Sequence, residues 1–132
     1  MGNEQDILKS CKTIAVVGLS ADEYKTSHRV ASYLQEQGYK IIPVNPNERE
    51  ILGEVCYASL AEVPGQVDVV DIFRKSEDVP PVVDDAIKVK AKTVWMQEGI
   101  VNEAAAKKAR DAGIQVVMDR CMLKEHLRLI NQ

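Results

Sequence analysis

The stretch from 13 to 46 constrains the fold more than any other part of this 132-residue chain. It consists of an apolar segment, TIAVVG, a polar loop with one glycine, GLSADEYKTS, a helical segment over Ser27–Gln37, and a second apolar segment that ends in PVNP. In the helical segment Val30 and Leu34 share one face, and Gly38 stops the helix. This order predicts two parallel strands joined by a crossover helix.

Near-continuous apolar runs recur along the rest of the chain and alternate with segments of helical spacing. Such runs are typical of parallel strands that helices cover on both faces. Strands are expected over Thr13–Val17, Lys40–Val44, Val67–Ile72, Thr93–Met96 and Gln115–Met118. Helices are expected over Glu4–Ser10, Ser27–Gln37, Ser76–Lys88, Asn102–Ala112 and Met122–Ile130. The expected fold class is therefore α/β: a Rossmann-like, doubly wound, mainly parallel five-stranded sheet with helices on both faces, in three α/β/α layers.

Residues at the predicted helix ends support this division. Asn102 is expected to cap one helix, and Ser76 another, whose first turn tolerates Pro80 and Pro81. The S-x-x-E spacing of Ser59–Glu62 predicts a capping box on a helix of one or two turns. Since the chain shows no linker and has an ordinary domain length, residues 1–132 are expected to form a single domain.

Composition excludes several classes of function. Seventeen basic against 20 acidic residues give a net charge of −3, so we expect no nucleic-acid partner. The N-terminal segment lacks the apolar run of a signal peptide or membrane span, so we expect a cytoplasmic protein without a membrane partner. Cys11, Cys56 and Cys121 lie far apart, as do His28 and His126, which favours neither a disulfide framework nor a metal site.

The first loop is the first place to look for a ligand, because parallel sheets bind ligands beyond the carboxyl ends of their strands. It begins with Gly18-Leu19-Ser20, but a dinucleotide-binding GxGxxG motif would need glycines at Ser20 and Glu23. Instead, Lys25-Thr26-Ser27 precedes the helix, and a cation with two hydroxyls suits phosphate oxygens. The alternative is that Thr26 or Ser27 caps the helix and Lys25 is solvated.

The second strand ends in Val44-Asn45-Pro46, where an NAD-binding domain would carry an acid for the ribose hydroxyls. A neutral Asn45 accepts a ribose that carries a phosphate, which an acid would repel. The alternative is a simple Asn-Pro turn.

The remaining strand ends offer further candidates. Phe73 and Arg74 can stack and pair with phosphate, or can be a core aromatic beside a surface cation. Gln97 and Gly99 can approach a ligand closely. Arg120 can attract an anion, and the following Cys121 is either a buried thiol or a thiol near the ligand.

No catalytic constellation is apparent in the sequence. His28 and His126 have no adjacent nucleophile, and both are interpreted as structural or solvated. Asp71, near the end of the third predicted strand, is expected to form hydrogen bonds within the sheet rather than to act as an acid or base. Whether the chain is an enzyme stays open, with the non-enzymatic alternative favoured.

Five motifs in register, AVVGLS with KTS following, GYKIIPVNP, VDVVDIFR, VWMQEGI and VVMDRC, resemble the small CoA-binding protein family. The fold of that family is similar to the N-terminal domain of the succinyl-CoA synthetase α subunit. The resemblance implies coenzyme A as ligand at the carboxyl end of the sheet. The ligand-binding residues expected from the resemblance and the loops are Gly18, Leu19, Ser20, Lys25, Thr26, Ser27, Val44, Asn45, Pro46, Phe73, Arg74, Gln97, Gly99 and Arg120.

Three functions remain as alternatives. The leading one is a stand-alone, non-catalytic module that binds CoA or acyl-CoA as a carrier or regulator, with a possible protein partner. The others are an NAD(P)-binding oxidoreductase and a CoA-ligase or transferase subunit that acts with a partner. A further hypothesis is a reversible mixed disulfide between Cys121 and CoA.

Overall fold

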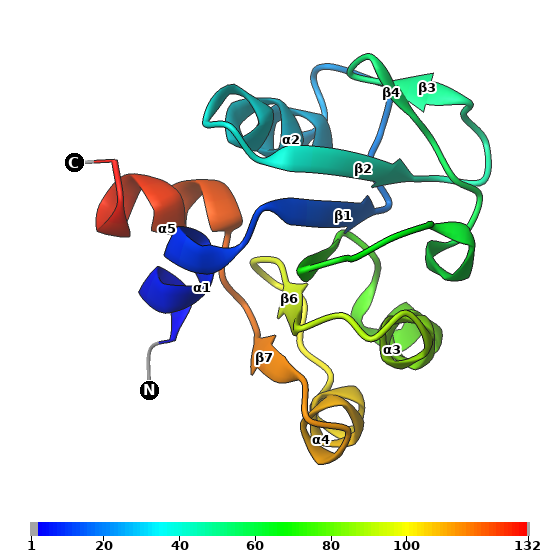
Figure 1. Ribbon diagram of the computed structural model, residues 1–132, viewed down its shortest axis with the longest axis vertical. Helices are drawn as coiled ribbons and strands as arrows, with labels where there is room; N and C mark the ends of the chain where they lie inside the picture. Colours follow the sequence, from blue (N-terminus) through cyan, green and yellow to red (C-terminus); the bar gives the residue numbers. More distant parts are fainter. Residues whose placement is uncertain (1–2, 132) are drawn as a thin grey trace.

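The computed structural model describes residues 3–131 and contains a five-stranded parallel sheet in the order β2-β1-β5-β6-β7 (Figure 1). A separate antiparallel hairpin, β3–β4, lies beyond the end of β2. The strands are β1 Thr13–Val17, β2 Lys40–Val44, β3 Glu50–Ile51, β4 Glu54–Val55, β5 Val69–Ile72, β6 Thr93–Met96 and β7 Gln115–Val117. The helices are α1 Glu4–Ser10, α2 Thr26–Glu36, α3 Val79–Lys88, α4 Glu103–Asp111 and α5 Met122–Leu129, with short 3₁₀ turns η1 Leu60–Glu62 and η2 Ser76–Asp78.

The helices cover both faces of the sheet, with α3 and α4 on one face and α1, α2 and α5 on the other (Figure 1). The central strands are mostly apolar because successive side chains enter opposite layers, and Asp71 of β5 is a buried exception. Ala15 and Val17 of β1 face α3 and α4, whereas Ile14 and Val16 face α2. This arrangement confirms the predicted α/β class, the parallel sheet and the three layers.

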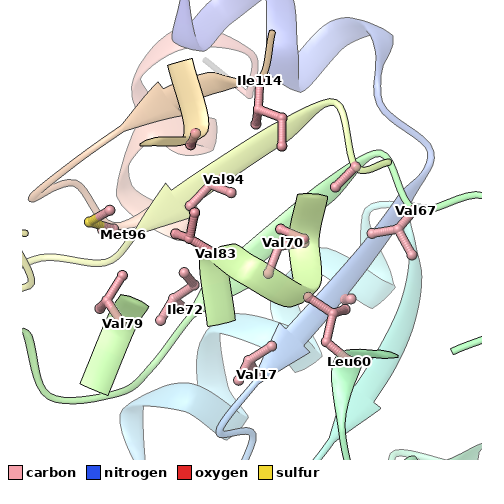
Figure 2. Packing of buried hydrophobic residues seen from close by; sticks show 14 of the residues in the cluster. Val17, Leu60, Val67, Val70, Ile72, Val79, Val83, Val94, Met96 and Ile114 are labelled. Atoms are coloured by element: carbon pink, nitrogen blue, oxygen red, sulfur yellow. The ribbon is translucent and has the colours of Figure 1, made fainter. Parts of the chain in front are cut away.

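Figure 2 shows the layer on the α3 and α4 side, where Val79 and Val83 of α3 lie over Val70 and Ile72 of β5. All four of these side chains are buried. At about 25 cal/mol per Å² of apolar surface, burying such a side chain contributes roughly 1.5–3 kcal/mol. The two layers therefore hold the strand ends, and the loops that follow them, in fixed relative positions.

Some predicted element boundaries are wrong. β5 begins at Val69 rather than Val67. The preceding Asp68 uses its carboxylate to accept hydrogen bonds from the backbone N–H groups of Lys12 and Thr13, at 2.8 and 3.1 Å. β7 ends at Val117 rather than Met118. The β3–β4 hairpin is not anticipated by the sequence patterns, because each of its strands has only two residues.

Two predicted caps are also wrong, and one is confirmed. Ser76 accepts a hydrogen bond from Val101 N at 3.1 Å and begins a 3₁₀ turn, so that α3 starts only at Val79. The side chain of Ser59 makes no hydrogen bond to the backbone of η1 and instead contacts the Glu62 carboxylate at 3.4 Å. Asn102 caps α4 as predicted, accepting from Ala105 N at 2.9 Å.

The predicted domain of residues 1–132 includes three residues that lie outside the described part of the chain. No helix within residues 3–131 has both the length and the apolar character that crossing a bilayer requires.

Candidate functional site

The reversal of strand order locates the candidate site. The chain runs from β1 outward to β2, then passes back across β1 to form β5 on its other side. In doubly wound sheets, such a reversal leaves a crevice between helices on opposite faces, and ligands bind there; in this sheet the reversal lies beyond the carboxyl ends of β1 and β5. Gly18 and Phe73 are the residues that directly follow these two strands.

Gly18 allows the two loops to approach each other closely. Its φ of +89° lies in the left-handed region, and a β-carbon at this position would collide with the backbone carbonyl oxygen of Phe73. The same β-carbon would lie 3.3 Å from Nη1 of Arg74. The first glycine of the loop is thus needed for the packing of the crevice itself.

Arg74 places a cation in this crevice. Its side chain is half-buried, and within residues 3–131 it forms neither an ion pair nor a hydrogen bond. A partly desolvated guanidinium without a protein partner is well suited to a phosphate or carboxylate group, which it can bind through two parallel N–H bonds.

The loop before α2 is held by hydrogen bonds between its two ends. Ser20 N donates to Ser27 Oγ at 3.0 Å, and the ring Nδ1 of His28 lies 2.8 Å from Ser20 O. Lys25 occupies the N-cap position, and no side chain caps the helix, so the predicted capping by Thr26 or Ser27 is wrong. Lys25 and Thr26 remain exposed at the N-terminus of α2, the end that favours anions.

Asn45 links the second loop to the first. Its Nδ2 donates to Leu19 O at 2.9 Å, and its Oδ1 accepts from Asn47 N at 2.8 Å, which closes the Asn-Pro turn around the exposed Pro46. Gly18 N donates to Val44 O at 2.9 Å and continues this connection. The turn interpretation of Asn45 is therefore confirmed, and the turn lies beside the crevice.

A cavity of about 130 Å³ opens beside these loops on the α3 side of the sheet. Val44 and Arg74 line it, as do Ser59 near η1 and Asp85 on α3. Sequence reasoning missed Ser59 and Asp85 as site residues, because neither follows a strand and no local pattern connects them with the crevice.

A second group of loop residues lies at the ends of β6 and β7. Gly99 N donates to Asp119 Oδ1 at 2.7 Å, and Arg120 Nη1 donates to Asp119 O at 2.8 Å. β7 is three strands away from β1, or about 14 Å at about 4.8 Å per strand. Arg120 therefore lies apart from the residues that follow β1, β2 and β5. Asp119 links Gly99 to Arg120, and sequence reasoning could have included Asp119 because it directly precedes Arg120.

Gln97 follows β6 but is buried rather than open to solvent. Its Nε2 donates to Oδ1 of Asp71 at 2.5 Å. Asp71 therefore forms a hydrogen bond within the sheet region, as predicted, and its partner is the residue that follows β6. Burial raises the pKa of Asp71 to about 7, although the Gln97 hydrogen bond acts in the opposite direction.

Several aromatic, cysteine and histidine side chains lie in or against the core. Phe73 is half-buried and packs against the α2 layer, and Trp95 is fully buried with Nε1 donating to Arg120 O at 2.8 Å. Cys121 is buried at the N-cap of α5, the first of its two predicted alternatives. His126 is buried against Tyr33, whose hydroxyl lies 2.8 Å from its Nδ1, so this histidine is structural.

This sheet order and this crevice define a Rossmann-like α/β protein. The family model described as "CoA binding domain" matches residues 12–127. The chain belongs to this family of CoA-binding domains, as the resemblance predicted.

Relatives of similar length carry the whole fold. The uncharacterized protein YneT of Bacillus subtilis is 43% identical over 122 residues, which cover 92% of this chain and 90% of that protein. The solved structure of a hypothetical protein from Pyrococcus horikoshii OT3 is 42% identical, with a TM-score of 0.94 and coverage of 97% of this chain and 90% of that one.

Larger relatives contain the fold as one part. The ADP-forming acetate–CoA ligase I of Archaeoglobus fulgidus is 35% identical over 74 residues, which are 56% of this chain and 11% of the ligase. The apo structure of the dinucleotide forming acetyl-coenzyme A synthetase 1 of Ca. Korarchaeum cryptofilum is 30% identical, with a TM-score of 0.71 over 80% of this chain and 25% of the synthetase. The chain thus spans only a small part of these two enzymes.

Proposed function

We propose that this chain binds coenzyme A or an acyl-CoA as a stand-alone, non-catalytic module with a carrier or regulatory role. The main support for the proposal is the state of Arg74. It is a half-buried cation without a protein partner in the described chain, and it lies at the crevice between β1 and β5. Family membership supports CoA as the ligand class.

The distribution of charge fits such a ligand. CoA carries a diphosphate and a 3′-phosphate, so a chain of net charge −3 has to bind it through a local group of cations. Arg74 in the crevice and Lys25 at the N-terminus of α2 are the candidates for the phosphates. The neutral Asn45 adds no repulsion to this end of the site.

The extent of the site fits the pantetheine arm. Loops after β2, β1, β5 and β6 form a row that crosses three inter-strand spacings, or about 14 Å. A compact ligand would fill only one end of this row. We place the phosphates near Gly18 and Arg74 and the arm toward Gln97 and Gly99, with Arg120 beyond.

Isothermal titration calorimetry with CoA, acetyl-CoA, NAD and NADP tests the proposal. We expect the chain to bind both CoA compounds. We expect an Arg74→Met variant to bind CoA about tenfold or more weakly, with its heat of unfolding unchanged. Arg110→Met removes an exposed arginine of α4, on the α3 and α4 face of the sheet, and is the matched control. Binding of NAD or NADP without CoA would support the oxidoreductase alternative and refute the proposal.

A second candidate is a subunit that acts with a protein partner. Its support is the match to acetate–CoA ligases, in which this fold is a fraction of a larger enzyme. Affinity purification of the tagged chain with CoA present tests it, and co-purification of a ligase or transferase subunit is the expected result. The cytoplasmic location and the single-domain organisation stay predictions.

A further inference from the structure

Asp71 is a carboxylate in an apolar layer. It lies on β5, the central strand, next to Val16 of β1 and Trp95 of β6 in register, and it has no exposed surface. Its Oδ1 accepts from Gln97 Nε2 at 2.5 Å, whereas its Oδ2 is the only side-chain N or O atom buried without a partner within residues 3–131. Burying a carboxyl group with one unsatisfied oxygen costs stability, so its presence calls for another reason.

A stabilising link between strands does not supply that reason. Backbone pairing already joins β5 to β6 from the Val69–Thr93 pair to the Ile72–Met96 pair. A half-satisfied polar pair is less stabilising than an apolar pair of the same volume. The consequence of the contact lies instead in what it does to the Gln97 side chain.

That effect is a fixed orientation of the side-chain amide. The two ends of a glutamine amide have nearly the same shape, but one donates and the other accepts. Because Asp71 Oδ1 accepts from Nε2, the carbonyl oxygen Oε1 of Gln97 is the end left for another partner. Gln97 keeps a small exposed area, and its Oε1 is not among the buried atoms without a partner.

The position of Gln97 makes this orientation relevant to binding. It directly follows β6, and Gln97 O accepts from Ile100 N at 2.9 Å, which closes the turn around Gly99 at the carboxyl edge. We propose that Asp71 is a positioning residue that holds the Gln97 amide with Oε1 toward the ligand, where it accepts a hydrogen bond from an amide N–H of the pantetheine arm. This inference rests on the proposed binding of CoA.

Calorimetry with two ligands tests it. CoA carries the arm, and adenosine 3′,5′-bisphosphate carries the phosphoadenosine part without the arm. For Asp71→Leu we expect CoA affinity to fall about tenfold, the equivalent of one hydrogen bond, and bisphosphate affinity to stay within about twofold. Val70→Ala, on the same strand but facing the α3 layer, is the control for a general disturbance of the core and should leave the ratio of the two affinities unchanged.

The outcomes separate the inference from the proposed function. A wild-type chain that does not bind CoA refutes the proposed function and this inference with it. If the wild type binds CoA, unchanged CoA affinity in the variant, or an equal loss for both ligands, overturns only the inference. Should Asp71→Leu fail to fold, Asp71→Asn replaces it: its amide can present either end to Gln97, so a smaller but equally selective loss is expected, and no loss overturns the inference.

Discussion

Nη1 of Arg74 lies 3.3 Å from the point that a β-carbon on Gly18 would occupy. The cation of one loop and the bare backbone of the other are thus adjacent at the reversal of strand order. Neither residue can change without affecting the shape of the crevice.

Gly18→Ala is expected to lower the free energy of unfolding by about 2–5 kcal/mol, because the methyl group adds left-handed strain to a collision with the Phe73 carbonyl. Urea denaturation followed by circular dichroism measures this. Gly113→Ala is the control: its φ is +86°, but nothing lies within 4 Å of the new methyl group, so only the strain of about 1–2 kcal/mol should appear. Equal losses in the two variants would contradict the close approach at Gly18.

Asn45→Asp is expected to weaken CoA binding by about tenfold, because it places a negative charge near the phosphates and removes the hydrogen bond to Leu19 O. The affinity for dephospho-CoA, which lacks the 3′-phosphate, should fall less than the affinity for CoA. Asn47→Asp introduces the same charge two residues away on an exposed side chain and serves as the control in calorimetry. A larger loss in the control would place the phosphate elsewhere.

Asp71 should make stability depend on pH. Its pKa of about 7 in the folded chain exceeds the ordinary 3.8, so the folded state keeps the proton to higher pH than the unfolded state. The contribution of Asp71 to the free energy of unfolding should therefore fall as pH rises from about 4 to about 7 and level off above that, with a limit on the order of 4 kcal/mol. The Asp71→Asn side chain cannot ionise. The stability of this variant relative to wild type should therefore be greater at pH 8 than at pH 4.

Urea denaturation at these two pH values checks this expectation. Asp78→Asn, at an exposed carboxylate that forms no side-chain cap on α3, is the matched control. A stability difference between Asp71→Asn and wild type that is the same at both pH values would show that Asp71 does not hold its proton.

Asn102→Ala is expected to cost about 1 kcal/mol of stability, because it removes the hydrogen bond to Ala105 N and a second one from Nδ2 to Ser76 O. Ser59→Ala should change stability by less than about 0.5 kcal/mol, since Ser59 makes no capping bond. Thermal unfolding of both variants measures the contrast. A comparable loss for Ser59→Ala would restore the capping box that the sequence predicts.

The fold follows from the sequence because its signals are redundant. The central strands are mostly apolar on both faces, and residues such as Asn102 and Gly38 mark helix ends. Errors of one or two residues therefore do not change the topology. Near the element boundaries that failed, polar side chains have partners that are distant in the sequence. Asp68 bonds to the backbone of another strand, and Ser76 bonds to Val101 N, neither of which a local pattern contains.

The site is only partly predictable for a similar reason. A loop that follows a strand can be predicted from the sequence, and Gly18, Asn45 and Arg74 do lie at the carboxyl edge of the sheet. Burial and pairing are tertiary properties. The sequence therefore could not show that Gln97 is bound to Asp71, or that Asp85 of α3 lines the same cavity as Arg74.

The row of strand ends brings together loops that are far apart in the sequence, from Gly18 to Arg120. No hairpin connects these loops, because the strands that they follow are parallel. Each loop can open by local unfolding on its own when nothing bridges it to the next. A ligand lying along the row would tie these openings together, and amide hydrogen exchange would slow in all the loops at once. Occupancy would then change the dynamics of one whole edge of the molecule, a surface property that a second protein can detect without touching the ligand.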